Sequence, residues 1–312
     1  MPNAAPHHFR FVLFDGFSNL VLASAMEPLR DVRTRMLGAA PSWSVETLSG
    51  QAVRSSSGLS ISPSAAPDGP IAGQTTILVS GYGARIHATS ATLSRIRQLA
   101  HRSDRMIGLD AGAWLMAAAG LLDGHDATLH WQEFDDFQEA FPRVNLSRKS
   151  YVISGRMMTC GGASSALDLI LHLIKAQFGA VAAFDTSRMF LYDPDQPPRR
   201  EGPLRHSPPA LLRAINAMAE TVEQPLSLPQ ICIRARTSER TLHRLFNQEL
   251  NIAPGRYHQL LRLGRARDLA TESKLSVAEI ALRCGFSSAP ALSRAFTMTF
   301  GTSIRKIRKT HS

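Results

Sequence analysis

The sequence predicts two domains of different fold class: an α/β domain with a parallel sheet covered by helices on both faces, then an all-α domain. Short apolar runs alternate with helical segments through about residue 178, as in chains that form parallel sheets. A pattern of two helices is then written twice between residues 226 and 300. With 312 residues, 44% of them apolar, the chain is long enough to bury two cores.

The strands and helices of the first domain can be placed from apolar runs and helical spacing. Strands are expected at residues 9–14, 43–48, 75–79, 106–109 and 127–130. Helices are expected at residues 18–37, 88–101, 112–119, 132–140 and 163–178. Residues 151–153 and 157–160, joined through a glycine, indicate a hairpin. Ligands of such sheets bind outside the carboxyl ends of the strands, so we expect a pocket lined by the loops after Phe14, Val79, Leu109 and His130.

Residues 108–114 predict a sharp elbow at this pocket, because a strand runs into small residues and then directly into a helix, with Asp110 at the tip. Residues 9–180 resemble the class I glutamine amidotransferase-like fold of the PfpI superfamily, which implies a flavodoxin-like sheet. In the catalytic relatives the tip is a cysteine, a histidine follows the next strand and a carboxylate often assists. The resemblance assigns these three positions to Asp110, His130 and Val21.

The residue at the elbow tip favours a sensor over an enzyme. An aspartate is a weak nucleophile that mostly accepts hydrogen bonds, whereas a low-pKa thiolate attacks readily. Asp110 has three interpretations: a cap of the following helix, a ligand contact, or a covalent nucleophile with His130 as its base. We prefer the ligand contact, and we expect no catalytic residue, metal or cofactor.

A small cationic molecule would suit an acidic and aromatic pocket, through charge and cation–π attraction. The residues expected to line it are Asp110, Trp114, His130, Trp131 and Glu27, with Glu133 as a further candidate. Each has a structural alternative, since a histidine beside a tryptophan is commonly a core pair and a glutamate commonly lies at the surface.

The duplicated pattern predicts two helix-turn-helix motifs. Each copy opens with a capping box at Ser227 or Ser276. After a tight turn, Ser238 or Ser288 caps a second helix whose apolar residues recur at helical spacing. Such a second helix enters the DNA major groove. The residues left facing outward are Arg240, His243, Arg244, Asn247, Ala289, Pro290, Ser293 and Arg294.

The helix expected between the motifs sets a separation that fits DNA. Residues 254–273 would span roughly 30 Å, close to the roughly 34 Å between successive major-groove faces. Residues 208–312 resemble the DNA-binding domain of AraC-type transcriptional regulators, and the two-domain order is similar to GlxA-type members of that family. Three residues depart from the pattern: Arg236 replaces a turn glycine, Gly264 interrupts the linking helix, and Ile304 replaces a proline. A helical bundle with solvated arginines is the structural alternative.

The net charge of +10 lies in the second domain. Residues 199–312 hold 19 Lys and Arg against 8 Asp and Glu, whereas residues 1–198 hold 16 against 17. This asymmetry is typical of nucleic-acid binding, and membrane attachment is the weaker interpretation. Cys160, Cys232 and Cys284 have no paired spacing, which indicates a reducing cytosol, and no apolar run is long enough to span a bilayer.

Together these patterns predict a cytoplasmic transcriptional regulator that is not an enzyme. We expect a sensor domain at residues 1–183, a linker at 184–207 and a DNA-binding domain at 208–312. The expected partners are promoter DNA, a small effector such as an amino acid or quaternary amine, a second copy of the chain, and RNA polymerase if the protein is an activator, as the resemblance favours. Two alternatives stay open: an amidase or hydrolase that uses Asp110 and His130 and carries a basic helical appendage, and a nucleoid-type DNA coater with little sequence preference.

Overall fold

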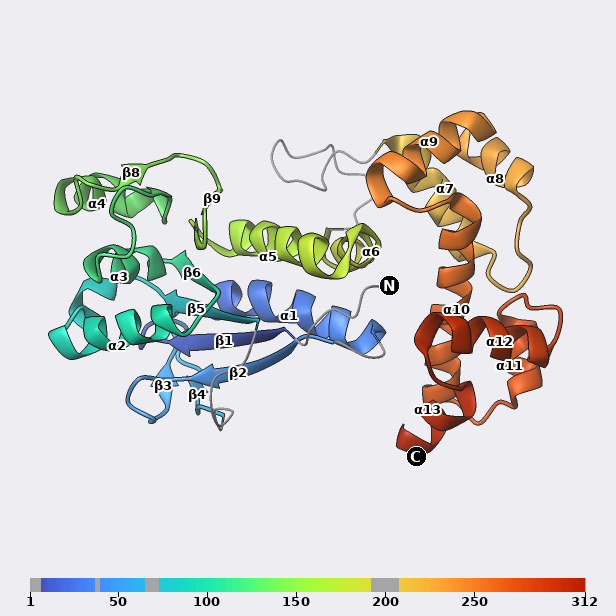
Figure 1. Ribbon diagram of the computed structural model, residues 1–312, viewed down its shortest axis with the longest axis horizontal. Coiled ribbons are helices and arrows are strands. Elements are labelled where there is room, and N and C mark those ends of the chain that lie inside the picture. The colour runs from blue at the N-terminus through green and yellow to red at the C-terminus, as the bar shows by residue number, and fades with distance from the viewer. Residues whose placement is uncertain (1–6, 37–39, 65–72, 192–207, 312) are drawn as a thin grey trace. The chain divides into compact units, whose positions relative to one another are not determined.

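A computed structural model describes residues 7–36, 40–64, 73–191 and 208–311 of the chain. These residues form two compact units, one built mostly from residues before Gly179 and the other from Gly179 onward. Figure 1 shows the strands gathered in the first unit and a purely helical second unit. The fold class predicted from the sequence is therefore confirmed.

The first unit is organised around a six-stranded sheet with strand order β2-β1-β5-β6-β10-β9. Its strands are β1 (His8–Leu13), β2 (Ser42–Glu46), β5 (Gln74–Ser80), β6 (Arg105–Asp110), β9 (Tyr151–Ser154) and β10 (Met157–Cys160). Neighbouring strands run parallel except β9 and β10, which form the predicted antiparallel hairpin. Every residue of β5 is buried, as a central strand covered on both faces requires.

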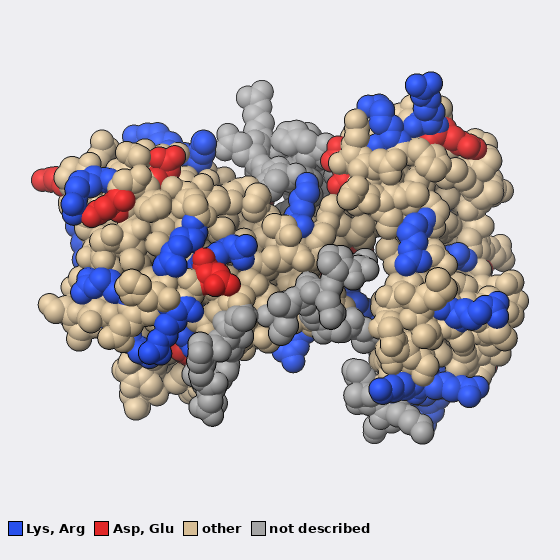
Figure 2. Space-filling view, in the orientation of Figure 1, with Lys and Arg blue, Asp and Glu red and all other residues tan. Residues whose placement is uncertain are grey.

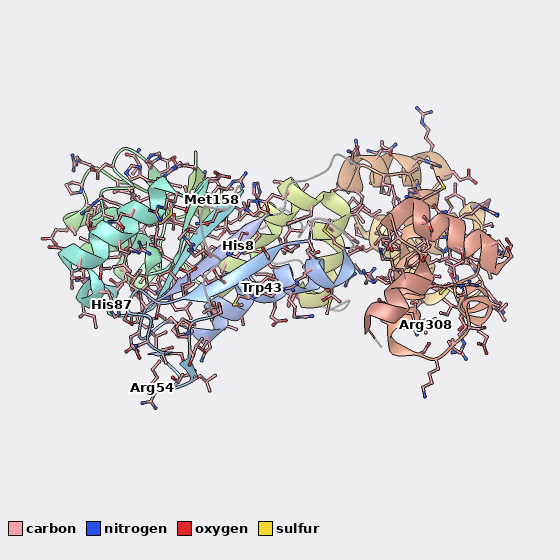
Figure 3. The ribbon with its side chains drawn as sticks, turned by 60° about the horizontal axis from the view of Figure 1, so that its bottom comes forward. His8, Trp43, Arg54, His87, Met158 and Arg308 are labelled. Carbon is pink, nitrogen blue, oxygen red and sulfur yellow. The ribbon has the colours of Figure 1, made fainter. Side chains whose placement is uncertain are left out.

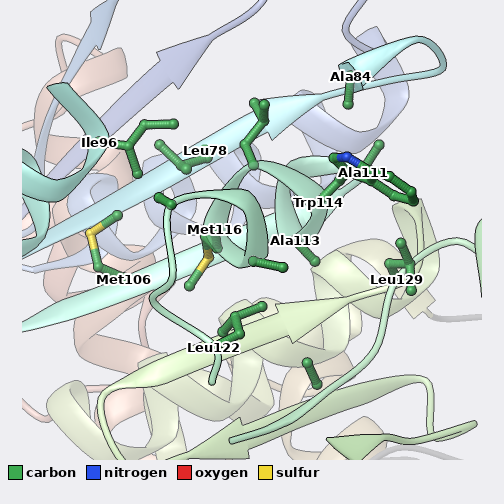
Figure 4. Close-up of a cluster of buried hydrophobic side chains, with 14 of the residues drawn as sticks. Leu78, Ala84, Ile96, Met106, Ala111, Ala113, Trp114, Met116, Leu122 and Leu129 are labelled. Atoms are coloured by element: carbon green, nitrogen blue, oxygen red, sulfur yellow. The ribbon is translucent and has the colours of Figure 1, made fainter. Parts of the chain in front are cut away.

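Helices cover this sheet and bury its apolar side chains. They are α1 (Asn19–Arg35), α2 (Ser90–His101), α3 (Gly112–Ala118), α4 (Phe134–Ala140) and α5 (Ala163–Phe178). Val12 and Leu78 join α2 and α3 in one core cluster, whereas their neighbours Phe11 and Ile77 must point to the opposite face, because side chains alternate along a strand. Figure 4 shows this cluster, with Trp114 at one end of it near Ala111.

The loops at the carboxyl ends of the strands meet, as the sequence predicts. The Asp15 carboxylate, just after β1, accepts a hydrogen bond of 2.8 Å from the Arg54 backbone N–H, and the Asp15 backbone oxygen accepts one of 3.0 Å from His87 Nε2. Figure 3 labels Arg54 and His87. Gly81 must be a glycine, because a Cβ there would stand 2.4 Å from the Gly16 oxygen.

Two details of the first unit differ from the prediction. The strand expected at residues 127–130 is only β7 (Asp126–Ala127), which pairs with β8 (Asn145–Leu146) outside the main sheet. The chain leaves the ladder because the next backbone N–H, of Thr128, donates to a side chain, Thr159 Oγ1, at 2.8 Å. A short hairpin of β3 (Val53–Arg54) and β4 (Ser60–Ile61) was not predicted, since two-residue strands carry no readable alternation.

The second unit contains helices from α6 to α13 arranged around two cores. They are α6 (Ala180–Leu191), α7 (Pro209–Glu220), α8 (Leu228–Ala235), α9 (Glu239–Leu250), α10 (Pro254–Glu272), α11 (Val277–Arg283), α12 (Ala289–Phe300) and α13 (Ile304–His311). One core joins α6 to α9 with Tyr257 of α10, and the other joins the later part of α10 with α11 to α13. Helix α10 is therefore shared by two similar halves, as Figure 1 shows.

Helix α6 occupies the first part of the range expected to be a linker. Phe184 is buried in the first core of the second unit, and Tyr257 donates a hydrogen bond of 2.7 Å to Asp185. The apolar and acidic residues of this stretch thus belong to a packed helix, and the contacts of the chain divide at Gly179. The remainder of the expected linker, residues 192–207, lies outside the described residues. No helix in the described part of the chain is long and apolar enough to cross a bilayer.

Candidate ligand site and nucleic-acid interface

The predicted elbow is present at the end of β6. Asp110 adopts a left-handed backbone with φ of 58°, a conformation that Asp tolerates better than most residues. The turn is tight enough to exclude side chains on both sides. A Cβ at Gly108 would lie 2.7 Å from the Ala113 nitrogen, and one at Gly112 would lie 2.5 Å from the Leu78 oxygen. Strained backbone of this kind is concentrated at functional sites.

The Asp110 carboxyl group is buried without a hydrogen-bond partner among the described residues. Its residue is only 8% exposed. Burial, and after it the charge of Glu133, raises the pKa of Asp110 to about 6. Asp110 does not cap α3, because the cap position is Ala111 and no side chain accepts a hydrogen bond there. The helix-cap interpretation therefore finds no support in the geometry.

Two more polar atoms at this edge of the sheet, Ser80 Oγ and His130 Nδ1, are buried and have no hydrogen-bond partner among the residues that the structure describes. Ser80 ends β5 and is the register partner of Asp110 in the sheet. The His130 ring packs edge-on against Tyr82, with 5.4 Å between ring centroids. Buried polar groups normally find partners, so unpaired ones at a loop edge mark a place where a bound molecule can supply them. The loop that begins at Ser80 was expected from the sequence to line the pocket, but the Ser80 side chain was not among the expected ligand contacts.

Trp114 is covered by the side chain of Arg85, called the strap below. It is 7% exposed and packs edge-on against Phe137 and Phe141, at 5.7 and 5.2 Å between ring centroids. The Arg85 guanidinium carbon stands 4.2 Å from the centroid of the Trp114 ring. Arg85 Nη2 also donates to Glu133 Oε2 at 3.0 Å and to Asp136. Arg85 was missed from the sequence, where an arginine in a loop carries no signal of the partners it will find.

The remaining predicted pocket residues lie further out. Trp131 is 70% exposed and packs beside His130, with 5.8 Å between ring centroids. Glu27 is eight residues into α1, roughly 12 Å along the helix from its start, and its carboxylate pairs with Arg30 at 2.6 Å. Val21, at the position of the assisting carboxylate, is buried. Among the described residues, no three His, Cys, Asp or Glu side chains gather as a metal site would need.

The first helix-turn-helix motif comprises α8 and α9. The capping box of Ser227 and Gln230 opens α8, and Ser238 caps α9 by accepting a hydrogen bond of 3.2 Å from the Thr241 N–H. Arg236 ends α8 with φ of 51°, so an arginine does occupy the left-handed position that glycine usually takes. Leu242, Leu245, Phe246 and Leu250 are buried. The opposite face of α9 leaves four predicted DNA contacts exposed: Arg240, His243, Arg244 and Asn247.

The second motif, α11 and α12, repeats this construction with a glycine at the turn. Ser276 with Glu279 forms the capping box and Ser288 caps α12. Gly285 has φ of 65°, and a Cβ there would stand 2.3 Å from Pro225 Cγ. Arg262 of the linking helix donates to the Gly285 oxygen at 2.8 Å and covers the Phe286 ring at 4.7 Å. The turn is thereby fixed to α10.

The outward face of α12 presents Pro290 and Arg294 exposed, with Ala289 and Ser293 half-buried. Helix α10, 19 residues long, spans roughly 28 Å between the two motifs. Arg244 makes one intrahelical hydrogen bond, to Gln248 at 3.3 Å, which DNA can replace. Figure 2 shows Lys and Arg side chains over the second unit on the face it presents.

Comparison with known proteins agrees with both units. A helix-turn-helix domain model matches residues 231–310. The HTH-type transcriptional regulator GbdR of Pseudomonas aeruginosa is 33% identical over 313 residues, which cover 98% of this chain and 85% of that protein. The HTH-type transcriptional regulator GlxA of Rhizobium meliloti is 32% identical over 308 residues, 96% of this chain and 94% of that protein.

A solved structure gives the fold of the first unit independently. A ThiJ/PfpI family protein from Pseudomonas syringae superposes with a TM-score of 0.53 and 21% identity, covering 75% of this chain and 90% of that one. The duplicated motif, the degenerate elbow and the full-length relatives lead to one conclusion. The chain belongs to the AraC family of HTH-type transcriptional regulators, among the GlxA-like members whose first domain has the PfpI fold.

Proposed function

We propose that the elbow of the first unit binds a small effector and that its occupancy controls binding of promoter DNA by the second unit. The observation that carries this proposal is a pair of buried polar atoms that have no hydrogen-bond partner in the described chain, Ser80 Oγ and His130 Nδ1, at the edge of the sheet where Asp110 is buried. An amino acid or a quaternary amine supplies the positive charge that Asp110 would accept. We further propose that the protein is a homodimeric activator that works with RNA polymerase in the cytoplasm.

The first unit acts as a sensor and not as an enzyme in this proposal. This preference rests on the residue at the elbow tip, because an aspartate is a weak nucleophile that mostly accepts hydrogen bonds. Hydrolysis of model amides or esters that disappears with Asp110→Asn would instead support the amidase or hydrolase alternative.

DNA contacts are proposed for the outward residues of α9 and α12, with Arg244 and Arg294 as the main candidates to bind base edges or phosphates. Footprinting on the DNA upstream of the protein's own gene, with and without candidate amino acids and quaternary amines, tests this function. We expect a defined protected site whose occupancy changes with one of these compounds. Uniform coverage without a boundary would point to the nucleoid-type alternative and contradict sequence-specific control.

The elbow is tested by Asp110→Asn in the same assay. The substitution removes a charge but keeps a residue that tolerates the left-handed backbone. We expect protection without effector to persist and the response to effector to weaken at least tenfold. An unchanged response would place effector binding elsewhere.

A further inference from the structure

The Arg85 side chain differs from an ordinary surface ion pair because it contacts an aromatic ring as well as carboxylates. Arg85 belongs to the 3-10 helix η1 (Ala84–His87), just after β5, and reaches the chain around α4. Its guanidinium group lies over an indole ring and between two carboxylates, those of Glu133 and Asp136. An aromatic face with flanking carboxylates is the arrangement by which proteins bind organic cations.

Negative charge remains at this place even with Arg85 in position. A surface hollow of ≈ 400 Å³ beside the strap is lined by Arg85, Trp114, Asp136, Glu139 and Ala140. Glu133 and Asp136 both pair with the guanidinium of Arg85, and Glu139 lines the same hollow. The buried and unpaired carboxyl group of Asp110 lies close enough to Glu133 to feel its charge. Two carboxylates and one guanidinium thus line the hollow, so a second cation would be attracted to it.

We propose that Trp114, Glu133 and Asp136 form a site for a small organic cation, and that the Arg85 side chain is a tethered occupant which the ligand displaces. This inference rests on the proposed function in one respect: the site adjoins the elbow, so displacing Arg85 would uncover Glu133 next to Asp110. Its ligand class follows from the occupant itself, a planar cation that can lie on an indole and donate to carboxylates.

The strap is suited to be displaced. The side chain of Arg85 is 47% exposed and that of Asp136 is 58% exposed, so its ion pairs are accessible to water. Exposed pairs of this kind are weak. A tethered competitor lowers the apparent affinity of a free ligand in proportion to the fraction of time it vacates the site. If Arg85 occupies the site about nine-tenths of the time, removing it should tighten binding of a free cation about tenfold.

Methylguanidinium is the probe for this test, because it is the head group of the arginine side chain. Trp114 is made the only tryptophan by Trp43→Phe and Trp131→Phe, and its fluorescence is titrated with the probe at constant ionic strength. We expect Arg85→Ala in this background to give a saturable change with a midpoint at least ten times lower than that of the parent. Equal midpoints, or no saturable change in the variant, would overturn the proposal.

Three further variants make the result specific. Arg85→Gln must behave as Arg85→Ala does, which keeps the test valid if one of them folds poorly. Adding Glu133→Gln and Asp136→Asn to Arg85→Ala must abolish saturation. Arg95→Ala removes an exposed guanidinium from α2, which donates to Gln98 in the described chain, and must leave the midpoint at the parent value.

The measurement separates this site from the regulatory proposal. Methylguanidinium binding that follows the expected order while effectors leave DNA protection unchanged would sustain the cation site and defeat the proposed regulation. The reverse pattern would sustain regulation through the elbow and defeat the role of Arg85.

Discussion

Replacing Asp110 with asparagine should stabilise the first unit at neutral pH. In the folded chain burial, and then the charge of Glu133, raises the pKa of the carboxyl group from 3.8 to about 6. Between these pH values the folded state binds more protons than the unfolded state, so the free energy of unfolding falls as pH rises. The shift corresponds to about 3 kcal/mol at roughly 1.36 kcal/mol per pKa unit. Asparagine cannot ionise and tolerates the left-handed backbone, so it avoids this cost.

The assay is urea unfolding followed by tryptophan fluorescence, because Trp43, Trp114 and Trp131 all lie in the first unit. Asp110→Asn should raise the free energy of unfolding by about 3 kcal/mol at neutral pH, and this gain should shrink toward zero near pH 4. Asp126→Asn, which changes an exposed carboxylate, should stay within about 0.5 kcal/mol of the parent. If the free energy of unfolding does not increase at neutral pH, or increases equally at both pH values, then the pKa of the Asp110 carboxyl group is not raised by burial as inferred.

Three further substitutions test the second unit. If Arg244 makes a bidentate contact with guanine, Arg244→Ala should cost about 1 to 3 kcal/mol of DNA affinity and relax the sequence preference at one base pair. Arg95→Ala should change neither the affinity nor the preference. Equal weakening across all sequences would indicate that Arg244 contacts phosphate. Gly264→Ala should raise the free energy of unfolding by about 1 kcal/mol, because its Cβ would meet open space within a continuous helix. The gain would appear as a higher melting temperature followed by circular dichroism. Gly285→Ala should lower the free energy of unfolding by roughly 1 to 3 kcal/mol, measured by thermal unfolding with circular dichroism, because φ is 65° and Pro225 fills the space that the new Cβ would need. An unchanged melting temperature would contradict the turn geometry.

The parts of the fold predicted correctly are those set by nearby residues. The capping boxes at Ser227 and Ser276 and the serine caps of α9 and α12 depend on contacts three residues apart, so spacing alone determined them. Helix α5 was placed residue for residue because its apolar periodicity is long. Helix α6 was not predicted, for the opposite reason. Phe184 and Asp185 become helical by packing against Tyr257, more than 70 residues away in sequence.

The features of the candidate ligand site also fall into those that could be predicted from nearby residues and those that could not. The elbow could be predicted because a strand, two glycines and a helix are consecutive, and the structure shows that each glycine is sterically required. Arg85 and Ser80 could not be predicted, because the residues they lie beside are distant in sequence: Glu133 and Asp136 for Arg85, and Asp110 for Ser80. The roles of Asp110, Trp114, His130, Trp131 and Glu27 in binding an effector stay predictions. The carboxylate of Glu27 already pairs with Arg30.

The shape of the elbow is set by its glycines. The backbone turn is imposed by Gly108 and Gly112, which must approach Ala113 and Leu78 closely whatever residue stands between them. The residue at the tip, Asp110, adopts a left-handed conformation. The carboxyl group is then held with no hydrogen-bond partner in the described chain and with a raised pKa, conditions that favour neutralisation by a proton or by a cationic ligand. This turn therefore holds an ionisable side chain at the loop edge where we propose that the effector binds.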